Sequence, residues 1–287
     1  MSSHLGIRSV IVALAVAGLS LFVTADAQAG DKDTKAKIAV FTHSGGFKHG
    51  CLAHAESVIK AIGGKSGAFE ATLLEGYKLK PQEIDLSFVT GEWLAQYDGI
   101  LFFTTTGPEE IESRLLNSDQ KGAFLDFVNG GKAFIGVHCA SDTFYHWPEY
   151  GELVGAYFNT HGPNHVPATL KVEDTEHPAT RMLGQEWVIA DEFYQFRDEP
   201  YSRDKLHVLL SIDVEKTDMK MQGKQTRKDN DYALAWCKNT GKGRMFYTAL
   251  GHRDDVWENE KFQAHLLGGI QWALGQLPGD ATPSGSK

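Results

Sequence analysis

The sequence has few cysteines, no excess of positive charge and no long apolar segment beyond its amino end. Its three cysteines, Cys51, Cys139 and Cys237, are an odd number, and none has the Cys-x-x-Cys spacing of a metal site. At most one disulfide bridge is possible, and three buried free thiols are the simpler interpretation. The formal net charge of −9 argues against nucleic acid or an anionic membrane as a partner, because either would need a basic surface.

What remains is the composition of an ordinary folded protein. The chain has 287 residues, of which 42% are hydrophobic and 23% charged, so disorder, coiled coil and collagen-like repeats are excluded. We find no internal repeat and no long linker. We therefore predict one domain over residues 30–277 and a small, polar, flexible tail over residues 278–287. The unusual count is histidine, with twelve residues.

The amino end is typical of a secretory signal over residues 1–29. Arg8 supplies a short basic region, Val10–Val23 is apolar, and Ala27-Gln28-Ala29 offers small residues for cleavage. A membrane anchor is the alternative, but fourteen apolar residues are short of the ~20 that a helix needs to span a bilayer. We expect a secreted or periplasmic protein that has no membrane contact after cleavage.

Apolar runs of strand length alternate with amphipathic segments in the first half, which indicates a mainly parallel sheet covered by helices. The expected strands are Lys37–Thr42, Phe69–Leu74, Gly99–Thr104 and Lys132–Val137, and the expected helices are Leu52–Ile62 and Ser118–Val128, the latter with Ser118 as its cap. In such α/β sheets ligands bind beyond the carboxyl ends of the strands.

The second half is less regular and is richer in expected strands. These are Thr169–Val172, Trp187–Ala190, Val208–Ile212, Tyr232–Cys237 and Arg244–Leu250, followed by a closing helix over Lys261–Leu274. Asp213–Asp231 is the longest polar stretch and is expected to be an exposed loop or hairpin.

Polar residues collect where these strands end. His43 and His49 flank two glycines after the first strand, His138 and Asp142 follow the fourth, and His252 follows the last. Asp191, Glu192 and Tyr194 end or follow the strand WVIA, and His161 lies in a separate loop, NTHGPNH. Because strand-end loops share one edge of the sheet, we expect His43, His49, His138, His161 and His252 to face one cleft.

Several stretches resemble the ThuA-like, or trehalose-utilisation, family. They are THSGGFKH, GVHCASDTFYHWPEYGELVGAYFNTH, EHPATRML, WVIADEFYQF and GKGRMFYTALGH, and they lie between Lys37 and Gly275. The resemblance implies a flavodoxin-like α/β sandwich similar to class I glutamine amidotransferases. It also implies carbohydrate metabolism, with trehalose-like disaccharides or their 3-keto derivatives as substrates, and brings no secure mechanism.

The same resemblance argues against a glutaminase. Class I amidotransferases carry a nucleophilic cysteine at the turn after a strand, in a Gly-x-Cys-x-Gly pattern. Here the matching stretch is Gly136-Val137-His138-Cys139-Ala140, so histidine takes the nucleophile position and Cys139 follows it. A thioester mechanism is disfavoured.

The polar cluster allows two kinds of chemistry. Neutral imidazole is either an acid–base group near neutral pH or a metal ligand. In the metal-free interpretation the catalytic candidates are His138, Glu192 and Asp142, and the substrate-binding candidates are His43, His49, Tyr194, His252 and Trp257. In the metal-assisted interpretation a divalent ion is bound by His138, His161, His252 and Glu192. The alternative to an enzyme is a non-catalytic carbohydrate- or partner-binding protein on the same fold.

Overall fold

The structure is a computed structural model that describes residue 1 and residues 35–286. The signal peptide predicted over residues 1–29 lies, apart from its first residue, outside the described residues. Residues 1–34 and 35–287 form separate units, and everything below concerns the second unit. Within the described residues, no helix combines the length and the apolar character that crossing a membrane requires.

A nine-stranded sheet runs through the domain, and its first five strands are parallel. Their order is β2 (Phe69–Leu73), β1 (Ala36–Phe41), β3 (Gly99–Phe102), β4 (Ala133–Val137) and β11 (Gly243–Thr248). Each matches a predicted strand, with ends shifted by at most two residues. β3 and β4 are buried along their whole length, as expected for strands that are covered on both faces.

Four antiparallel strands extend the same sheet beyond β11. They are β10 (Ala233–Thr240), β9 (His207–Ile212), β6 (Pro167–Val172) and β7 (Glu186–Ala190), and all four were predicted. A separate two-stranded sheet pairs β5 (Phe158–His161) with β8 (Tyr194–Phe196), and neither of these strands was predicted. The polar stretch over residues 213–231 contains no helix or strand, as expected.

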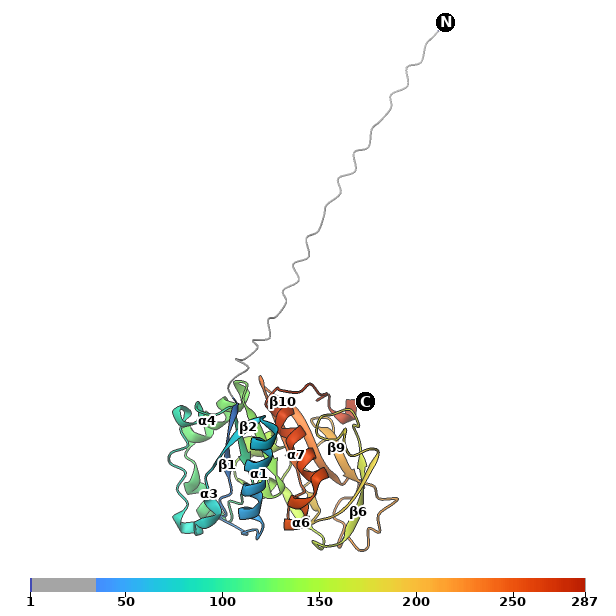
Figure 1. Ribbon diagram of the computed structural model, residues 1–287, viewed down its shortest axis with the longest axis horizontal. Coiled ribbons are helices and arrows are strands. Elements are labelled where there is room, and N and C mark those ends of the chain that lie inside the picture. Colours follow the sequence, from blue (N-terminus) through green and yellow to red (C-terminus); the bar gives the residue numbers. More distant parts are fainter. Residues whose placement is uncertain (2–34, 287) are drawn as a thin grey trace. The chain divides into compact units, whose positions relative to one another are not determined.

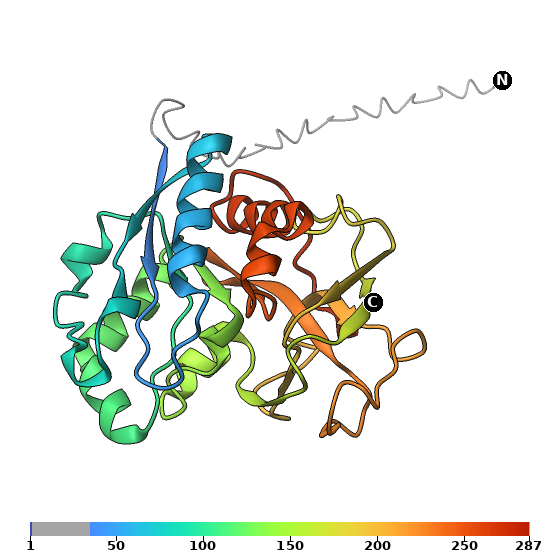
Figure 2. The same ribbon diagram turned by 60° about the horizontal axis from the view of Figure 1, so that its bottom comes forward.

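Helices cover both faces of the sheet. One face is covered by α1 (Leu52–Ser66), α6 (Asp254–Glu258) and α7 (Glu260–Ala273), and α1 and α7 lie side by side in both views (Figures 1 and 2). The other helices are α2 (Gly91–Leu94), α3 (Glu109–Leu115), α4 (Ser118–Asn129) and α5 (Pro148–Val154), with short 3₁₀ turns η1 (Gly76–Lys78), η2 (Pro81–Glu83), η3 (His138–Ser141) and η4 (Ser284–Ser286). The predicted α/β, flavodoxin-like class is confirmed.

Helix α4 begins one residue away from its predicted cap. Asn117, not Ser118, occupies the N-cap position, and its side chain accepts a hydrogen bond from the backbone N–H of Gln120. The side-chain oxygen of Gln120 accepts a hydrogen bond from the backbone N–H of Asn117, which completes a capping box. Asn and Ser are equally good caps, and only Asn117 has a glutamine three residues later to form that box.

The segment predicted to be a tail makes contacts with the domain. Trp272 Nε1 donates to the carbonyl of Gly279, and His207 Nδ1 lies 2.6 Å from the carbonyl oxygen of Thr282. The backbone N–H of Ser284 donates to the carbonyl of Leu206, at the start of β9. These contacts place residues 279–284 beside β9 and α7.

Candidate functional site

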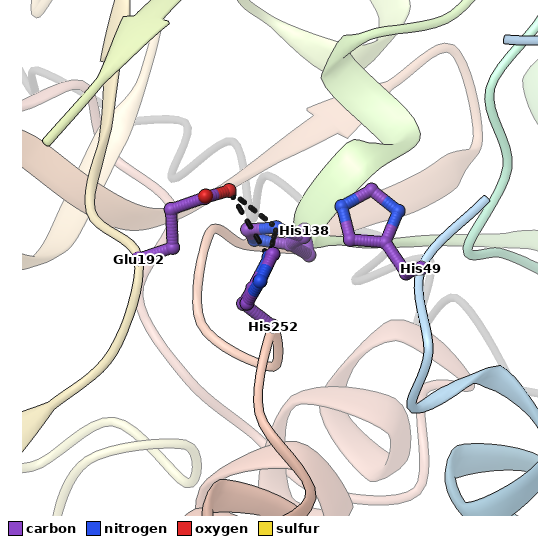
Figure 3. A group of neighbouring side chains, drawn as sticks. All are labelled: His49, His138, Glu192 and His252. Atoms are coloured by element: carbon purple, nitrogen blue, oxygen red, sulfur yellow. Dashed lines mark hydrogen bonds and ion pairs between the residues drawn. The ribbon is translucent and has the colours of Figure 1, made fainter. Parts of the chain in front are cut away.

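The side chains of His49, His138, Glu192 and His252 converge on one point (Figure 3). His138 is the first residue after β4, His252 lies in the loop after β11, and His49 lies in the loop between β1 and α1. These three strands are parallel, so their carboxyl ends share one edge of the sheet. Glu192 reaches the same point from the other half of the chain, two residues after β7.

Glu192 lies at the centre of the group and contacts three imidazoles. Its Oε2 is 3.4 Å from His138 Nε2 and 3.1 Å from His252 Nδ1, and its Oε1 is 3.0 Å from His161 Nδ1. His138 Nε2 and His252 Nδ1 are 3.3 Å apart. The ligating atoms of His49, His138, Glu192 and His252 all lie within 4.8 Å of one another.

His138 is held in an uncommon backbone conformation. Its φ of 45° lies in the left-handed region, which costs about 1 kcal/mol or more for a residue with a side chain. The ring is fully buried, its Nδ1 donates to the carbonyl of Ala249 at 2.6 Å, and the ring of Tyr194 packs on it at 4.1 Å between centroids. With Nδ1 as the donor to Ala249, Nε2 is the ring nitrogen that faces Glu192 and His252.

Asp191 joins the two loops that carry Glu192 and His252. It is fully buried, its Oδ1 accepts a hydrogen bond from the backbone N–H of Glu192 at 2.9 Å, and its Oδ2 accepts one from the N–H of Gly251 at 2.7 Å. Sequence reasoning noted Asp191 only as a strand-end residue. The signal that points to its role is a second acidic residue directly before Glu192, just after an edge strand that is buried on one face.

The charge states of the group follow from burial and from these contacts. Burial opposes ionisation of Glu192, but hydrogen bonds from His138 and His252 outweigh it and hold the pKa of Glu192 well below its usual range. Burial, reinforced by the neighbouring imidazoles, lowers the pKa of His49 to about 2, so that ring is neutral. Within the described residues, Nδ1 of His49 has no hydrogen-bond partner.

A cavity of about 310 Å³ opens beside this group, at the lower end of the size range of small-molecule sites. Its walls combine three aromatic rings with the polar group, and its lining residues are Phe47, His49, Asp142, Phe158, His161, Asn164, Glu192, Tyr194 and His252. Pairing of β5 with β8 sets His161 opposite Tyr194 and so builds one wall. Phe47, 63% exposed, lies at the rim.

Asp142 is the third predicted catalytic residue, and it lines the same cavity. The hydroxyl of Tyr145 donates to its Oδ1 at 2.7 Å. Burial raises the pKa of Asp142 above its usual value, although the hydrogen bond from Tyr145 opposes the shift. A raised carboxyl pKa brings a group closer to the range in which it exchanges protons at neutral pH.

Two predicted substrate-binding residues lie away from the cavity. His43 is buried against Phe41, and burial lowers its pKa to about 4. Trp257 is fully buried, stacks on Phe103 and donates from Nε1 to the carbonyl of Gly251. Trp257 therefore supports the loop that carries His252. Phe158 and Asn164, which the structure places in the cavity wall, have no distinguishing signal in the sequence.

Two glycine positions let the loops approach this closely. A Cβ on Gly45 would lie 2.5 Å from the carbonyl oxygen of Thr106, so the loop before His49 can pack on the loop after β3 only with glycine there. Gly251 has a φ of 117°, which a residue with a side chain rarely adopts, and it directly precedes His252.

Cys139 points away from the group into the core. It is 1% exposed, and burial raises the pKa of its thiol well above the usual value. A thiolate at this position would lack both solvent and a positive neighbour, so it does not serve as a nucleophile. Cys51 is also a buried free thiol, and Cys237 is buried.

Fold and site together define an α/β protein of the flavodoxin-like class, with a histidine- and carboxylate-rich cleft at the carboxyl edge of its parallel strands. Residues 37–273 match the ThuA family, described as trehalose utilisation, and the chain belongs to that family. The match covers nearly all of the described domain.

Solved structures show the same fold. A putative ThuA-like protein from Parabacteroides merdae is 19% identical with a TM-score of 0.68, over 86% of this chain and 93% of that one. A second from Bacteroides uniformis is 22% identical with a TM-score of 0.62, over 83% and 90% of the two chains. Among proteins with curated descriptions, none matches this chain.

Proposed function

We propose that the protein is an exported enzyme of carbohydrate utilisation that acts on trehalose-like disaccharides in their 3-keto form. The observation that carries the proposal is the cavity in which aromatic rings adjoin Glu192, Asp142 and three imidazoles. Flat rings suit the apolar faces of a sugar, and convergent acid–base groups suit proton transfer to and from it. Family membership supports the substrate class.

The reaction that fits these groups is an elimination. A base removes the proton on C2, which is acidic because the neighbouring C3 is a ketone. The electron pair forms a double bond between C2 and C1, the bond from C1 to the glycosidic oxygen breaks, and that oxygen takes up a proton. This step needs a base and an electrophile for the ketone oxygen but no nucleophile, in keeping with the buried thiol of Cys139.

Roles follow from position and basicity. Asp142, whose pKa is raised by burial, takes and returns the proton, and His252, which lines the cavity 3.1 Å from Glu192 Oε2, contacts the ketone oxygen. Phe47 and Tyr194 contact the faces of the sugar rings. A neutral substrate is consistent with the net charge of −9, which disfavours nucleic acid.

Turnover and binding of 3-ketotrehalose, measured on the same protein, test this proposal. We expect the wild type to release glucose, and we expect Asp142→Asn and Glu192→Gln to lose about 10²–10⁴-fold in kcat while still binding the sugar. His138→Ala should also abolish turnover, but it removes a fully buried ring, so the two isosteric variants are the decisive ones. Binding without turnover by the wild type would instead identify a carbohydrate-binding protein.

Export is tested separately by the mature amino terminus. We expect the chain recovered from the periplasm or medium to begin at Gly30. A chain that begins at Met1 and stays in the cytoplasm would contradict export and leave the reaction unaffected.

A further inference from the structure

The distances among three atoms of the site match the edges of a metal tetrahedron. His138 Nε2, His252 Nδ1 and Glu192 Oε2 are separated by 3.4, 3.1 and 3.3 Å. Four ligands at the usual Zn–N and Zn–O lengths lie about 3.3 Å from each other in tetrahedral geometry, and about 3.0 Å in octahedral geometry. The mean of the three separations agrees with the tetrahedral value.

The ring of His138 is oriented so that its second nitrogen faces the other two atoms. Nδ1 donates to the carbonyl of Ala249, which leaves Nε2 directed at Glu192 Oε2 and His252 Nδ1. A cation placed among these three atoms would contact all of them.

Neighbouring groups orient these three candidate ligands, as the residues around a metal site orient its ligands. The Nδ1 hydrogen bond of His138 orients its ring, and His161 Nδ1 lies 3.0 Å from Oε1, the second oxygen of Glu192. Asp191 ties the backbone of Glu192 to that of Gly251, next to His252. Side-chain exposure is 0% for His138, 8% for Glu192 and 16% for His252, so the three atoms are sheltered, and Glu192 and His252 line the cavity.

We propose that His138 Nε2, His252 Nδ1 and Glu192 Oε2 bind one zinc ion, with the fourth position open to the cavity. Two imidazoles and one carboxylate with an open position are one of the donor sets of catalytic zinc sites. His49 completes the surroundings, because its neutral ring lies within 4.8 Å of the same atoms and its Nδ1 is unpartnered among the described residues (Figure 3).

The role of the ion rests on the proposed function. A ketone oxygen in the fourth position would be polarised by the ion, which acidifies the neighbouring C2 proton and supplies the electrophile that the elimination needs. Asp142 lines the same cavity and is not part of the ligand set, so it stays free to take that proton. The ion is neither oxidised nor reduced.

Metal uptake by the untagged protein tests the site independently of activity. Full-length mature protein is stripped with a chelator, dialysed, and titrated with Zn²⁺ and with Co²⁺, whose visible bands become intense in tetrahedral sites. We expect about one equivalent of zinc per chain and the intense cobalt spectrum. Glu192→Gln and His252→Ala should each weaken binding at least about 100-fold, more than loss of an outer contact does. His165→Ala, an exposed histidine close to this site, should bind as the wild type does.

The proposal is overturned if folded wild-type protein takes up no stoichiometric zinc, if the ligand variants bind as tightly as the wild type, or if octahedral iron or manganese binds in its place. Circular dichroism of each variant confirms folding. Turnover of 3-ketotrehalose by chelator-treated, metal-free protein would refute the ion's role and leave the proposed reaction standing. Stoichiometric zinc binding without turnover of any keto sugar would refute the proposed reaction and leave the zinc site standing.

Discussion

The carboxylate of Asp191 offers a sharp test of how the site is held together, because it bridges two loops through buried hydrogen bonds. In Asp191→Asn one oxygen becomes an NH₂ group, which must face the backbone N–H of either Glu192 or Gly251. One hydrogen bond is lost, worth about 0.5–1.5 kcal/mol, and a buried N–H is left without an acceptor, which costs about 1–3 kcal/mol. We therefore expect the free energy of unfolding to fall by about 2–4 kcal/mol.

Thermal unfolding measures this directly. For a domain of this size each kcal/mol lowers Tm by about 2–4 °C, so Asp191→Asn should lower it by roughly 4–16 °C. The matched control is Asp198→Asn, because Asp198 is exposed, and its Tm should stay within about 2 °C of the wild type. Asp191→Asn should also weaken zinc binding by about 10–100-fold, as loss of an outer contact does. An unchanged Tm in Asp191→Asn would refute the bridging role.

Three further predictions follow from burial. Burial lowers the pKa of His265 to about 4, so between pH 6.5 and 4 the unfolded chain binds a proton that the folded chain does not. The free energy of unfolding should therefore be fully present above pH 6.5 and fall by up to about 3 kcal/mol as the pH drops to 4, with a smaller fall in His265→Gln. An equal fall in both proteins, measured by urea unfolding, would contradict this. Phe47→Ala should raise KM for the sugar yet change stability by less than about 0.5 kcal/mol, since Phe47 is 63% exposed; an unchanged KM would remove Phe47 from the site. Cys139→Ser should keep full activity in the keto-sugar assay while losing about 1–3 kcal/mol of stability from a buried hydroxyl, and loss of turnover by folded protein would restore the thiol as a candidate nucleophile.

The parallel half of the domain was predictable because β1, β3 and β4 contain continuous apolar runs. Once those strands are placed, the rule that their carboxyl ends share an edge brings His138 and His252 together, as the structure shows. From the sequence, Glu192 could be placed at the end of a strand but not in this site. Its approach to the site depends on the antiparallel strands and on the β5–β8 pair, whose short mixed sequences give no strand signal.

Side-chain direction within a loop could not be read from the sequence. His43 and His49 flank the same glycines and looked equivalent, but His43 packs on Phe41 in the core while His49 turns to the cavity. Trp257 follows His252 by five residues, and the short helix α6 buries its ring beneath the loop. These outcomes depend on which side chains fill the core, and adjacent positions in a loop do not specify it.

The central claim is that this cavity removes a proton from a keto sugar and thereby breaks a glycosidic bond. Proton NMR of 3-ketotrehalose with the protein in D₂O tests it most directly. We predict loss of the C2 proton signal of the keto ring together with release of glucose, and neither change with Glu192→Gln. Glucose released with its partner's C2 proton retained would contradict elimination, and binding with no change in either signal would contradict catalysis.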